Sequence, residues 1–261
     1  MKPHREHQGP AGFPRCYPLD SPASRFGSVS WITLKAEKVS QRHITITKYA
    51  DYLWLLDARG VAYLPACDWL VVSDLHLEKG SYLRSYANPL PSLDSTATLT
   101  RLEGIIDDYK PLRVISLGDS FHDKHSMSRM TFDDRQHLCR LVDSVNEWMW
   151  VEGNHDPDLP DGIPGTPCFE IVLDNMVFRH EVETSETRAQ VIGHYHPKKR
   201  TTITRRRYSG KCFTNNENVF VMPAFGQFTG GLDIDEEVML TLLPKRSRQV
   251  FMLYDNIIFK V

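Results

Sequence analysis

Short runs of apolar residues separated by polar turns dominate the chain from about residue 43 onward. The first four runs are rich in β-branched and aromatic residues and have the length of strands. They occupy residues 43–47, 52–56, 61–64 and 69–73. The run at 69–73 is almost wholly apolar, which is typical of a strand covered on both faces.

Two longer segments show helical rather than alternating periodicity. In residues 91–110, Leu99, Leu102 and Ile106 recur at helical spacing, and residues 131–148 carry a similar apolar face. Each segment is followed by a short apolar run, at 112–117 and at 148–152. Strand, helix and strand in alternation predict βαβ units and a parallel sheet.

The second half of the chain changes character and is expected to be mostly strands. The predicted strands are 169–173, 176–180, 189–194, 219–223, 238–243 and 250–255. An α/β half followed by a β half favours two mixed sheets packed together and flanked by helices, over residues 41–261. Residues 1–40 are rich in Pro, Gly, Ser and charge without periodicity, and are expected to be a disordered extension.

Composition sets limits on the class of protein. Of the 261 residues, 41% are hydrophobic and 25% charged, with a net charge of −2, so nothing global points to a nucleic-acid partner. No apolar run approaches the roughly 18 residues of a membrane-spanning helix, and the N-terminus lacks the apolar core of a signal peptide. Five cysteines without a CxxC pair are expected to be free thiols in a reducing cytoplasm.

Polar residues that bind metals or transfer protons follow five of the apolar runs. They are Asp74 and His76; Asp119 and His122; Asn154 and His155; His180; and His194 and His196. Each group alone is common in ordinary turns. In α/β sheets, however, ligands bind beyond the carboxyl ends of the strands, and five such groups in one chain indicate a shared site.

His194 and His196 raise the metal hypothesis most directly. If the segment is extended, side chains two residues apart point to the same side, so both rings would face one point. The full set combines carboxylates, imidazoles and a carboxamide without cysteine, which suits Mn, Fe or Zn. There are enough ligands for two divalent ions that share a carboxylate, the arrangement that serves phosphoester hydrolysis.

The order DxH, GD, GNHD, H and GHxH between residues 74 and 196 resembles the calcineurin-like metallophosphoesterase superfamily. The resemblance implies an α/β sandwich of two mixed sheets between helices (α/β/β/α). It also implies that Asp74, His76 and His196 hold one metal, that Asn154, His180 and His194 hold the other, and that Asp119 bridges them. A metal-bound hydroxide would then attack phosphorus, and His155 would protonate the leaving group.

A narrower resemblance rests on DLHLEKGSYLR, GDSFHD and PAFGQFTGG (223–231), which are similar to segments of the ligase-associated DNA damage response endonuclease (PdeM) family. That family implies a bacterial, manganese-dependent endonuclease of DNA repair associated with a helicase, a DNA ligase and an exonuclease. The leading hypothesis is therefore a two-metal phosphodiesterase that cuts single-stranded or damaged DNA. The GDSFH segment also resembles the GDxFH of DNA-repair nucleases of the superfamily, which implies that His122 contacts the scissile phosphate, although a supporting role beside another site residue fits equally well. Glu78 stands where the family usually has glycine, which places an added carboxylate near the site.

A basic run that begins two residues after His196 is a candidate contact for substrate phosphates. The candidates are Lys198, Lys199 and Arg200, with Arg205, Arg206 and Arg207 further along, and Lys79 and Arg84 after the first motif. A solvated charged hairpin is the alternative. Tyr82, Tyr86, Tyr195 and Phe228 could stack on bases, but ordinary surface aromatics explain them as well.

Two other functions remain open at this point. The same centre could hydrolyse small phosphoesters, such as a cyclic nucleotide or a pyrophosphate, because two metals attack any accessible diester. A lipid-linked pyrophosphate is disfavoured by the lack of an amphipathic insertion after residue 156. A scaffold without activity is disfavoured because every ligand position is filled.

Overall fold

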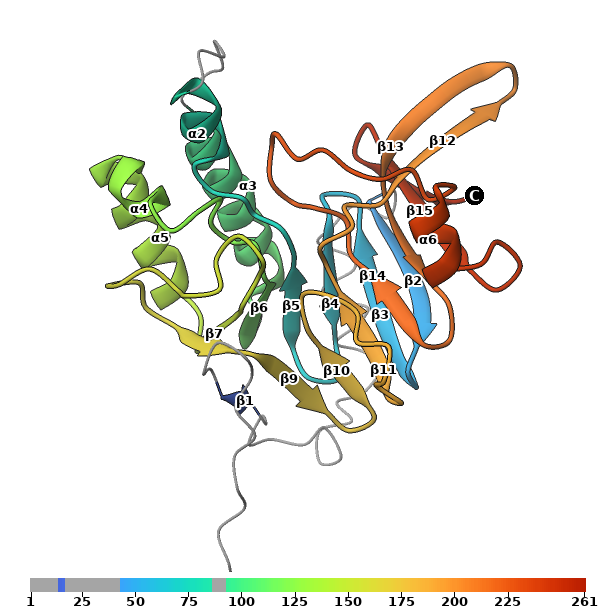
Figure 1. Ribbon diagram of the computed structural model, residues 1–261, viewed down its shortest axis with the longest axis horizontal. Coiled ribbons are helices and arrows are strands. Elements are labelled where there is room, and N and C mark those ends of the chain that lie inside the picture. Colours follow the sequence, from blue (N-terminus) through green and yellow to red (C-terminus); the bar gives the residue numbers. More distant parts are fainter. Residues whose placement is uncertain (1–13, 17–42, 86–92) are drawn as a thin grey trace, which may run out of the picture.

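The computed structural model describes residues 14–16, 43–85 and 93–261, which form two β-sheets packed face to face with helices outside them (Figure 1). The first sheet begins with a meander and continues with parallel strands. Its seven strands, in spatial order, are β2 (Ile44–Tyr49), β3 (Tyr52–Asp57), β4 (Val61–Leu64), β5 (Trp69–Val72), β6 (Arg113–Leu117), β7 (Glu147–Val151) and β8 (Thr166–Cys168). From β5 to β8 all neighbours are parallel, as the predicted βαβ units require.

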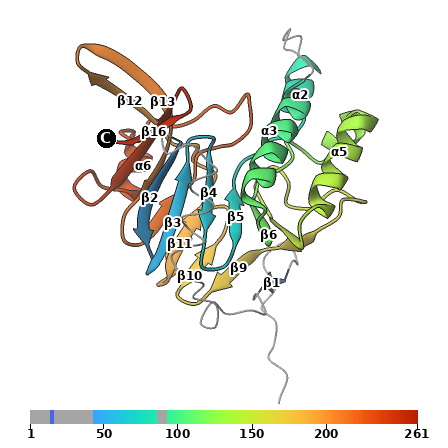
Figure 2. The same ribbon diagram turned by 180° about the vertical axis from the view of Figure 1, so that it is seen from behind.

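Helices cover the outer face of this sheet (Figure 2). They are α2 (Lys79–Ser85), α3 (Asp94–Tyr109), α4 (Ser126–Arg129) and α5 (Phe132–Asp143). The apolar face predicted for α3 is confirmed, because Leu99, Leu102 and Ile106 are buried in one cluster with Leu138 of α5. Because β5 to β8 are parallel, their carboxyl ends lie at the same edge of the sheet. The loops that lead to the helices begin at this edge.

The second sheet has nine strands. Its order is β1 (Arg15–Cys16), β9 (Glu170–Leu173), β10 (Met176–Phe178), β11 (Ala189–Ile192), β14 (Val219–Val221), β13 (Arg206–Asn215), β15 (Gln249–Tyr254) and β16 (Ile257–Lys260), and β12 (Lys198–Ile203) pairs with β13 outside this path. Trp54, Trp69 and Phe178 are fully buried between the two sheets. The predicted sandwich of two mixed sheets with flanking helices is confirmed.

The strand predicted at residues 238–243 is wrong, since a short helix, α6 (Glu237–Leu242), occupies this position. Met239 and Leu243 lie four residues apart and are both fully buried against the outer face of the second sheet, while Val238 is 55% exposed. This is helical burial spacing, but six residues with a nearly continuous apolar pattern do not distinguish it from a strand. Pro244 follows, where a helix cannot readily continue.

Two of the five cysteines are not free thiols, so that expectation is wrong for Cys16 and Cys168, which form a disulfide. Their sequence separation of 152 residues left no local spacing signal. Cys16 lies on β1, which pairs with β9, whereas Cys168 ends β8 in the other sheet. Apart from residues 14–16, the expected disordered extension at 1–40 lies outside the described residues. None of the helices in the described part of the chain combines the length and apolarity needed to cross a membrane.

Candidate metal centre

The loops that follow β5 and β6 continue the parallel pairing of their strands. The backbone N–H groups of Asp74, His76 and Leu77 donate to carbonyl oxygens of residues 118–120, at 2.9–3.2 Å. The His122 N–H in turn donates to the Leu77 carbonyl at 3.0 Å. The two polar motifs, whose aspartates Asp74 and Asp119 are 45 residues apart in sequence, are therefore held side by side by backbone hydrogen bonds.

Five of the seven predicted metal ligands adopt left-handed backbone conformations. They are Asp74, His76, Asp119, His194 and His196, with φ between 45° and 66°. Such conformations are uncommon for residues other than glycine, cost roughly 1–3 kcal/mol each, and cluster at functional sites. The extended geometry assumed for His194 and His196 is wrong, because β11 ends at Ile192 and both histidines lie in the following loop.

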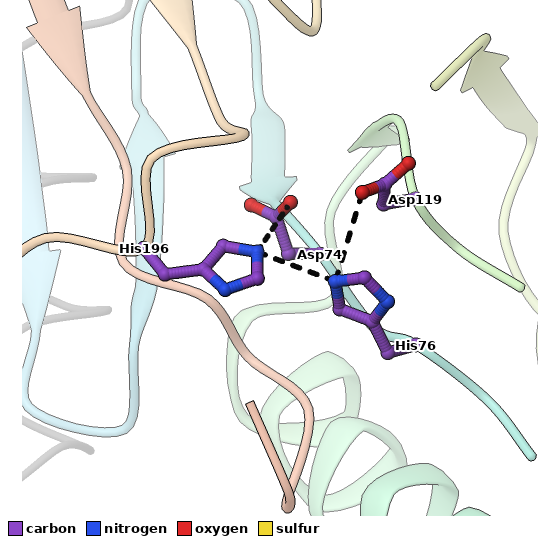
Figure 3. A group of neighbouring side chains, drawn as sticks. All are labelled: Asp74, His76, Asp119 and His196. Atoms are coloured by element: carbon purple, nitrogen blue, oxygen red, sulfur yellow. Dashed lines mark hydrogen bonds and ion pairs between the residues drawn. The ribbon is translucent and has the colours of Figure 1, made fainter. Parts of the chain in front are cut away.

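Four side chains nevertheless converge on one point (Figure 3). One potential ligand atom from each of Asp74, His76, Asp119 and His196 lies within 4.8 Å of the other three. His196 Nε2 is 3.0 Å from Asp74 Oδ1 and 3.2 Å from His76 Nε2, and His76 Nε2 is 3.7 Å from Asp119 Oδ2. Two imidazole nitrogens and two carboxylate oxygens around a common centre fit a divalent cation.

Two of the remaining predicted ligands, His180 and His194, lie next to this group. His180 Nε2 is 3.4 Å from Asp119 Oδ2 and 3.4 Å from His194 Nδ1. The His180 Nδ1 atom faces the Leu117 carbonyl at 2.8 Å, so Nε2 is directed at the site. Asn154 is exposed, and its amide nitrogen lies 3.4 Å from Glu181 Oε2. Asp119 Oδ2 therefore lies within 4 Å of the Nε2 atoms of both His76 and His180.

Electrostatics prepares most of these groups to bind a cation. Burial lowers the pKa of His76 to about 3, although Asp74 and Asp119 oppose the shift. Burial alone would raise the pKa of Asp74, but His196 and the other neighbouring imidazoles hold it below its usual value. These ligands are therefore deprotonated at neutral pH, as metal binding demands. The burial of His180 is outweighed by Asp119 and Asp74, which raise its pKa to about 9; a bound cation would displace that proton.

Gly193 is required by the close approach of the loop after β11 to the first motif. A Cβ atom at this position would lie 2.0 Å from Ser73 Oγ and 2.7 Å from Asp74 Oδ2. The same hydroxyl donates to Asp74 Oδ2 at 2.6 Å, and the His194 N–H is 3.3 Å from Asp74 Oδ1. Any larger residue would displace the Asp74 carboxylate.

Two acidic residues near the site were not among the predicted site residues. Asp156 is buried and accepts backbone hydrogen bonds from Asp119, Ser120 and Phe121 at 2.7–3.0 Å, and burial raises its pKa to about 7. The carboxylate of Glu181 lies 3.9 Å from His194 Nε2 as well as next to Asn154. The sequence could have indicated both residues, because Asp156 directly follows the GNH motif and Glu181 directly follows His180.

The two predicted catalytic histidines lie beside the metal ligands. His155 Nε2 is 4.0 Å from Asp119 Oδ2, and 48% of its side chain is exposed, so this ring is accessible to a substrate. The rings of His155 and His122 stack, with centroids 5.1 Å apart. The ring of Tyr82, which is partly buried, packs edge-to-face with His122 at a centroid distance of 4.5 Å, so Tyr82 supports this side of the site.

The segment 223–226 lies on the opposite side of the first motif. The N–H groups of Phe225 and Gly226 donate to the carbonyls of Ser73 and Asp74 at 2.8 and 2.9 Å. A Cβ at Gly226 would lie 2.3 Å from the Leu75 carbonyl, so only glycine fits this approach. The motif that carries Asp74 is thereby enclosed by backbone on both sides, which gives the family-specific PAFG sequence a structural role.

Two cations hold this segment from outside. Lys211 Nζ donates to the carbonyls of Ala224 and Gly226 at 2.6 and 2.9 Å, and Arg101 donates to the Phe225 carbonyl. The Arg101 guanidinium also lies over the Phe225 ring, 3.9 Å from its centroid. Burial, with Arg101 and Lys198 nearby, lowers the pKa of Lys211 to about 7.

Glu78 contacts the start of α3 rather than the predicted metal ligands. Its Oε1 accepts a hydrogen bond from Ser95 Oγ at 2.7 Å, and its backbone N–H donates to the same hydroxyl at 2.9 Å. Its φ of 67° explains why glycine suits this position in related sequences.

The predicted phosphate-binding residues are distributed around the centre. Lys79 begins α2, and burial lowers its pKa while Asp119 and Asp74 oppose the shift. Arg84 lies in the last turn of the same helix. On β12, Lys199 pairs with Asp235 at 2.9 Å, and Arg200 lies 3.9 Å from Asp233 with 81% of its side chain exposed. Lys198 is partly buried at the base of the strand.

The other predicted stacking aromatics are less well placed than Tyr82. Tyr195 packs against the apolar cluster under α6, and Phe228 is partly buried. Tyr86 lies outside the described residues.

The profile of the calcineurin-like phosphoesterase family matches residues 69–233, more than half of the chain. This chain belongs to that family. It is therefore a hydrolase of phosphoester bonds, and the buried Asp and His cluster fits the dinuclear divalent metal site that such enzymes use. The predicted superfamily resemblance is confirmed.

One solved structure agrees with this assignment at the level of the fold. The nuclease MPE of Pseudomonas putida is 24% identical, with a TM-score of 0.65 over 84% of this chain and 100% of that chain. The phosphoesterase YfcE of E. coli is 12% identical over 72% of this chain and 88% of its own, with a TM-score of 0.35. Among curated protein sequences, none matches significantly.

Proposed function

We propose that this phosphoesterase is a manganese-dependent endonuclease that cleaves single-stranded DNA in DNA repair. The observation that carries the proposal is the convergence of Asp74, His76, Asp119 and His196 on one point, with the exposed ring of His155 beside it. The fold shared with a protein named as a nuclease supports a nucleic-acid substrate. The PdeM-like segments and the basic strand β12 also support a nucleic-acid substrate.

The chain's own residues divide the chemistry between them. The residues of this set would hold divalent cations, which would supply Lewis acidity and positive charge toward a phosphate group. Asp119 would orient both ligand groups, because its Oδ2 atom lies 3.7 Å from His76 Nε2 and 3.4 Å from His180 Nε2. His155 is free to approach the leaving oxygen from the solvent side and donate the proton that an alkoxide needs. His122, stacked on His155, would keep that ring in place or touch the phosphate directly.

The first test is nicking of circular single-stranded DNA with added manganese. Wild type should nick the circle, which has no ends for an exonuclease to use. Asp119→Ala should be inactive, because both ligand groups depend on this carboxylate. His137→Ala is the matched control, since His137 pairs with Glu103 at 3.1 Å on the helical face and should keep full activity.

A second substrate separates the alternatives. Hydrolysis of bis-p-nitrophenyl phosphate without any nicking would retain the phosphodiesterase centre but reject DNA as substrate, in favour of a small diester such as a cyclic nucleotide. Inactivity toward both substrates, with metal bound, would reject the catalytic proposal.

A further inference from the structure

The hairpin of β12 and β13 projects beyond the second sheet as a two-stranded arm (Figures 1 and 2). β12 pairs with β13 from Lys198↔Lys211 to Ile203↔Arg206, and within the described part of the chain β12 has no other neighbouring strand. Only residues 212–215 of β13 belong to the main sheet, where they pair with β15. An isolated two-stranded hairpin is marginally stable in water, so extending it beyond the sheet adds little to the stability of the fold. Stability therefore does not explain the length of this hairpin.

The arm carries concentrated positive charge. Residues 198–211 contain seven lysines and arginines and no carboxylate, in a protein whose net charge is −2. Near the base, Asp235 and Asp233 partly neutralise Lys199 and Arg200. At the tip, Arg205, Arg206 and Arg207 are exposed, and no described carboxylate forms an ion pair with them. The uncompensated charge is therefore at the end of the arm.

One groove along the hairpin has the chemistry of a phosphodiester contact. It is lined by Arg200, Thr201, Thr202, Arg207, Tyr208 and Ser209. Arginine and hydroxyl side chains are among the groups that commonly contact nucleic-acid phosphates and sugars, and such contacts hold the backbone without reading sequence. Arg200 pairs with Ser209 and Thr202 pairs with Arg207, so two arginines and two hydroxyls share one face of the hairpin. An acidic protein partner would satisfy the arginines but would leave these hydroxyls without a specific role.

The arm also has a defined reach. β12 starts two residues after His196, and its six residues span about 20 Å at roughly 3.3 Å per residue. Stacked nucleotides advance about 3.4 Å each, so the tip lies about six nucleotides from the base of the arm beside the metal centre.

We propose that the β12–β13 hairpin is a nucleic-acid arm that binds the backbone of the substrate strand about six nucleotides from the scissile phosphate. This inference rests on the proposed function for its substrate. It predicts that the enzyme distinguishes long from short substrates through the tip arginines. Small diesters, which cannot reach the tip, would be hydrolysed without its help.

The test compares R205Q/R206Q/R207Q with K48Q/K110Q/R140Q, which removes the same charge from exposed positions elsewhere. Binding of 4- and 20-nucleotide single strands is measured by fluorescence anisotropy, and cleavage is measured on the same strands and on bis-p-nitrophenyl phosphate. The tip variant should bind the 20-mer about tenfold more weakly at moderate salt, and the slope of log affinity against log salt should fall by about 2, since each lost single-strand contact contributes about 0.7. The 4-mer and the small diester should be unaffected within about twofold, because the tip makes no contact with them.

The proposal would be rejected if the tip variant lost equal affinity for the 4-mer and the 20-mer. It would also be rejected if binding of the 20-mer were unchanged, or if the control variant lost as much affinity as the tip variant. Circular dichroism would verify that the variant folds. Because binding is measured apart from cleavage, absence of DNA cleavage by wild type would reject the endonuclease proposal. The anisotropy data would still show whether the β12–β13 hairpin binds single-stranded DNA.

Discussion

Asp156 holds the backbone of Asp119 in place, because its Oδ1 accepts a hydrogen bond from the Asp119 N–H at 2.9 Å. Its Oδ2 accepts from Ser120 and Phe121 as well. An amide can offer only one acceptor oxygen here, and its NH₂ group would face a backbone donor. Asp156→Asn should therefore lower stability by about 1–3 kcal/mol and weaken metal binding together with activity.

Manganese titration by calorimetry and urea unfolding of the metal-free protein would measure both effects. Asp158→Asn, an exposed carboxylate two residues further on, is the matched control and should leave both quantities unchanged. If the two variants behave alike, Asp156 has no positioning role.

The exposed position of His155 predicts different effects on two substrates. A DNA alkoxide needs a proton to leave, whereas p-nitrophenolate leaves well without one, and general acid catalysis contributes roughly 10²–10⁴-fold. His155→Ala should lower kcat on DNA by at least about a hundredfold and change hydrolysis of bis-p-nitrophenyl phosphate by much less. Equal losses on both substrates would show that His155 does not act as the acid.

Two metals sharing Asp119 predict a specific stoichiometry. His196→Ala removes a ligand from one side of Asp119 and His180→Ala removes one from the other, so each variant should keep about one tightly bound ion, compared with two in wild type. Asp119→Ala should lose both. Metal analysis after dialysis measures this, with His137→Ala as the control, and two ions retained in His180→Ala would contradict the assignment of His180.

The strand ends were the informative part of the sequence. The parallel strands β5, β6 and β7 each end in one of the predicted motifs, and the carboxyl ends of parallel strands meet at one edge of a sheet. The grouping of Asp74, His76 and Asp119 could therefore be predicted from the sequence. The conformation of His194 and His196 could not, since left-handed backbone is imposed by the surrounding loops and not by these residues themselves.

Other features depend on contacts between distant segments. Asp156 resembles an ordinary turn residue until its carboxylate is seen beneath residues 119–121. The disulfide of Cys16 and Cys168 depends on the pairing of β1 with β9, which no local pattern indicates. The helix α6 is decided by burial of Met239 against the second sheet, which overrides a strand-like sequence.

Glu78 offers a test of backbone strain separate from its side-chain contact. Glu78→Ala and Glu78→Gly both remove the hydrogen bond between the carboxylate and Ser95, but only glycine adopts a φ of 67° without a steric cost. The glycine variant should be more stable than the alanine variant by about 1 kcal/mol in urea unfolding. Both should keep the metal stoichiometry of wild type, because the Glu78 carboxylate is directed at Ser95. Equal stability of the two variants would show that position 78 is not strained.

Lys211 predicts how stability depends on pH. Its pKa is lowered to about 7 in the folded protein by burial and by neighbouring cations, and returns to its usual value near 10.5 on unfolding. The unfolded state therefore binds more protons between about pH 7 and 10, so the destabilisation caused by the charged amine is complete below pH 7 and is relieved as the pH rises through this interval. Lys211→Met removes the titrating amine and therefore lacks this pH dependence.

Between pH 6.5 and 9.5, the free energy of unfolding of wild type relative to this variant should rise by at least about 1.4 kcal/mol, which corresponds to one pKa unit. Urea unfolding at pH 6.5, 8 and 9.5 measures the difference, with the exposed Lys260→Met as a control that should show no trend. A constant difference for Lys211→Met would mean that this amine keeps its ordinary pKa in the fold.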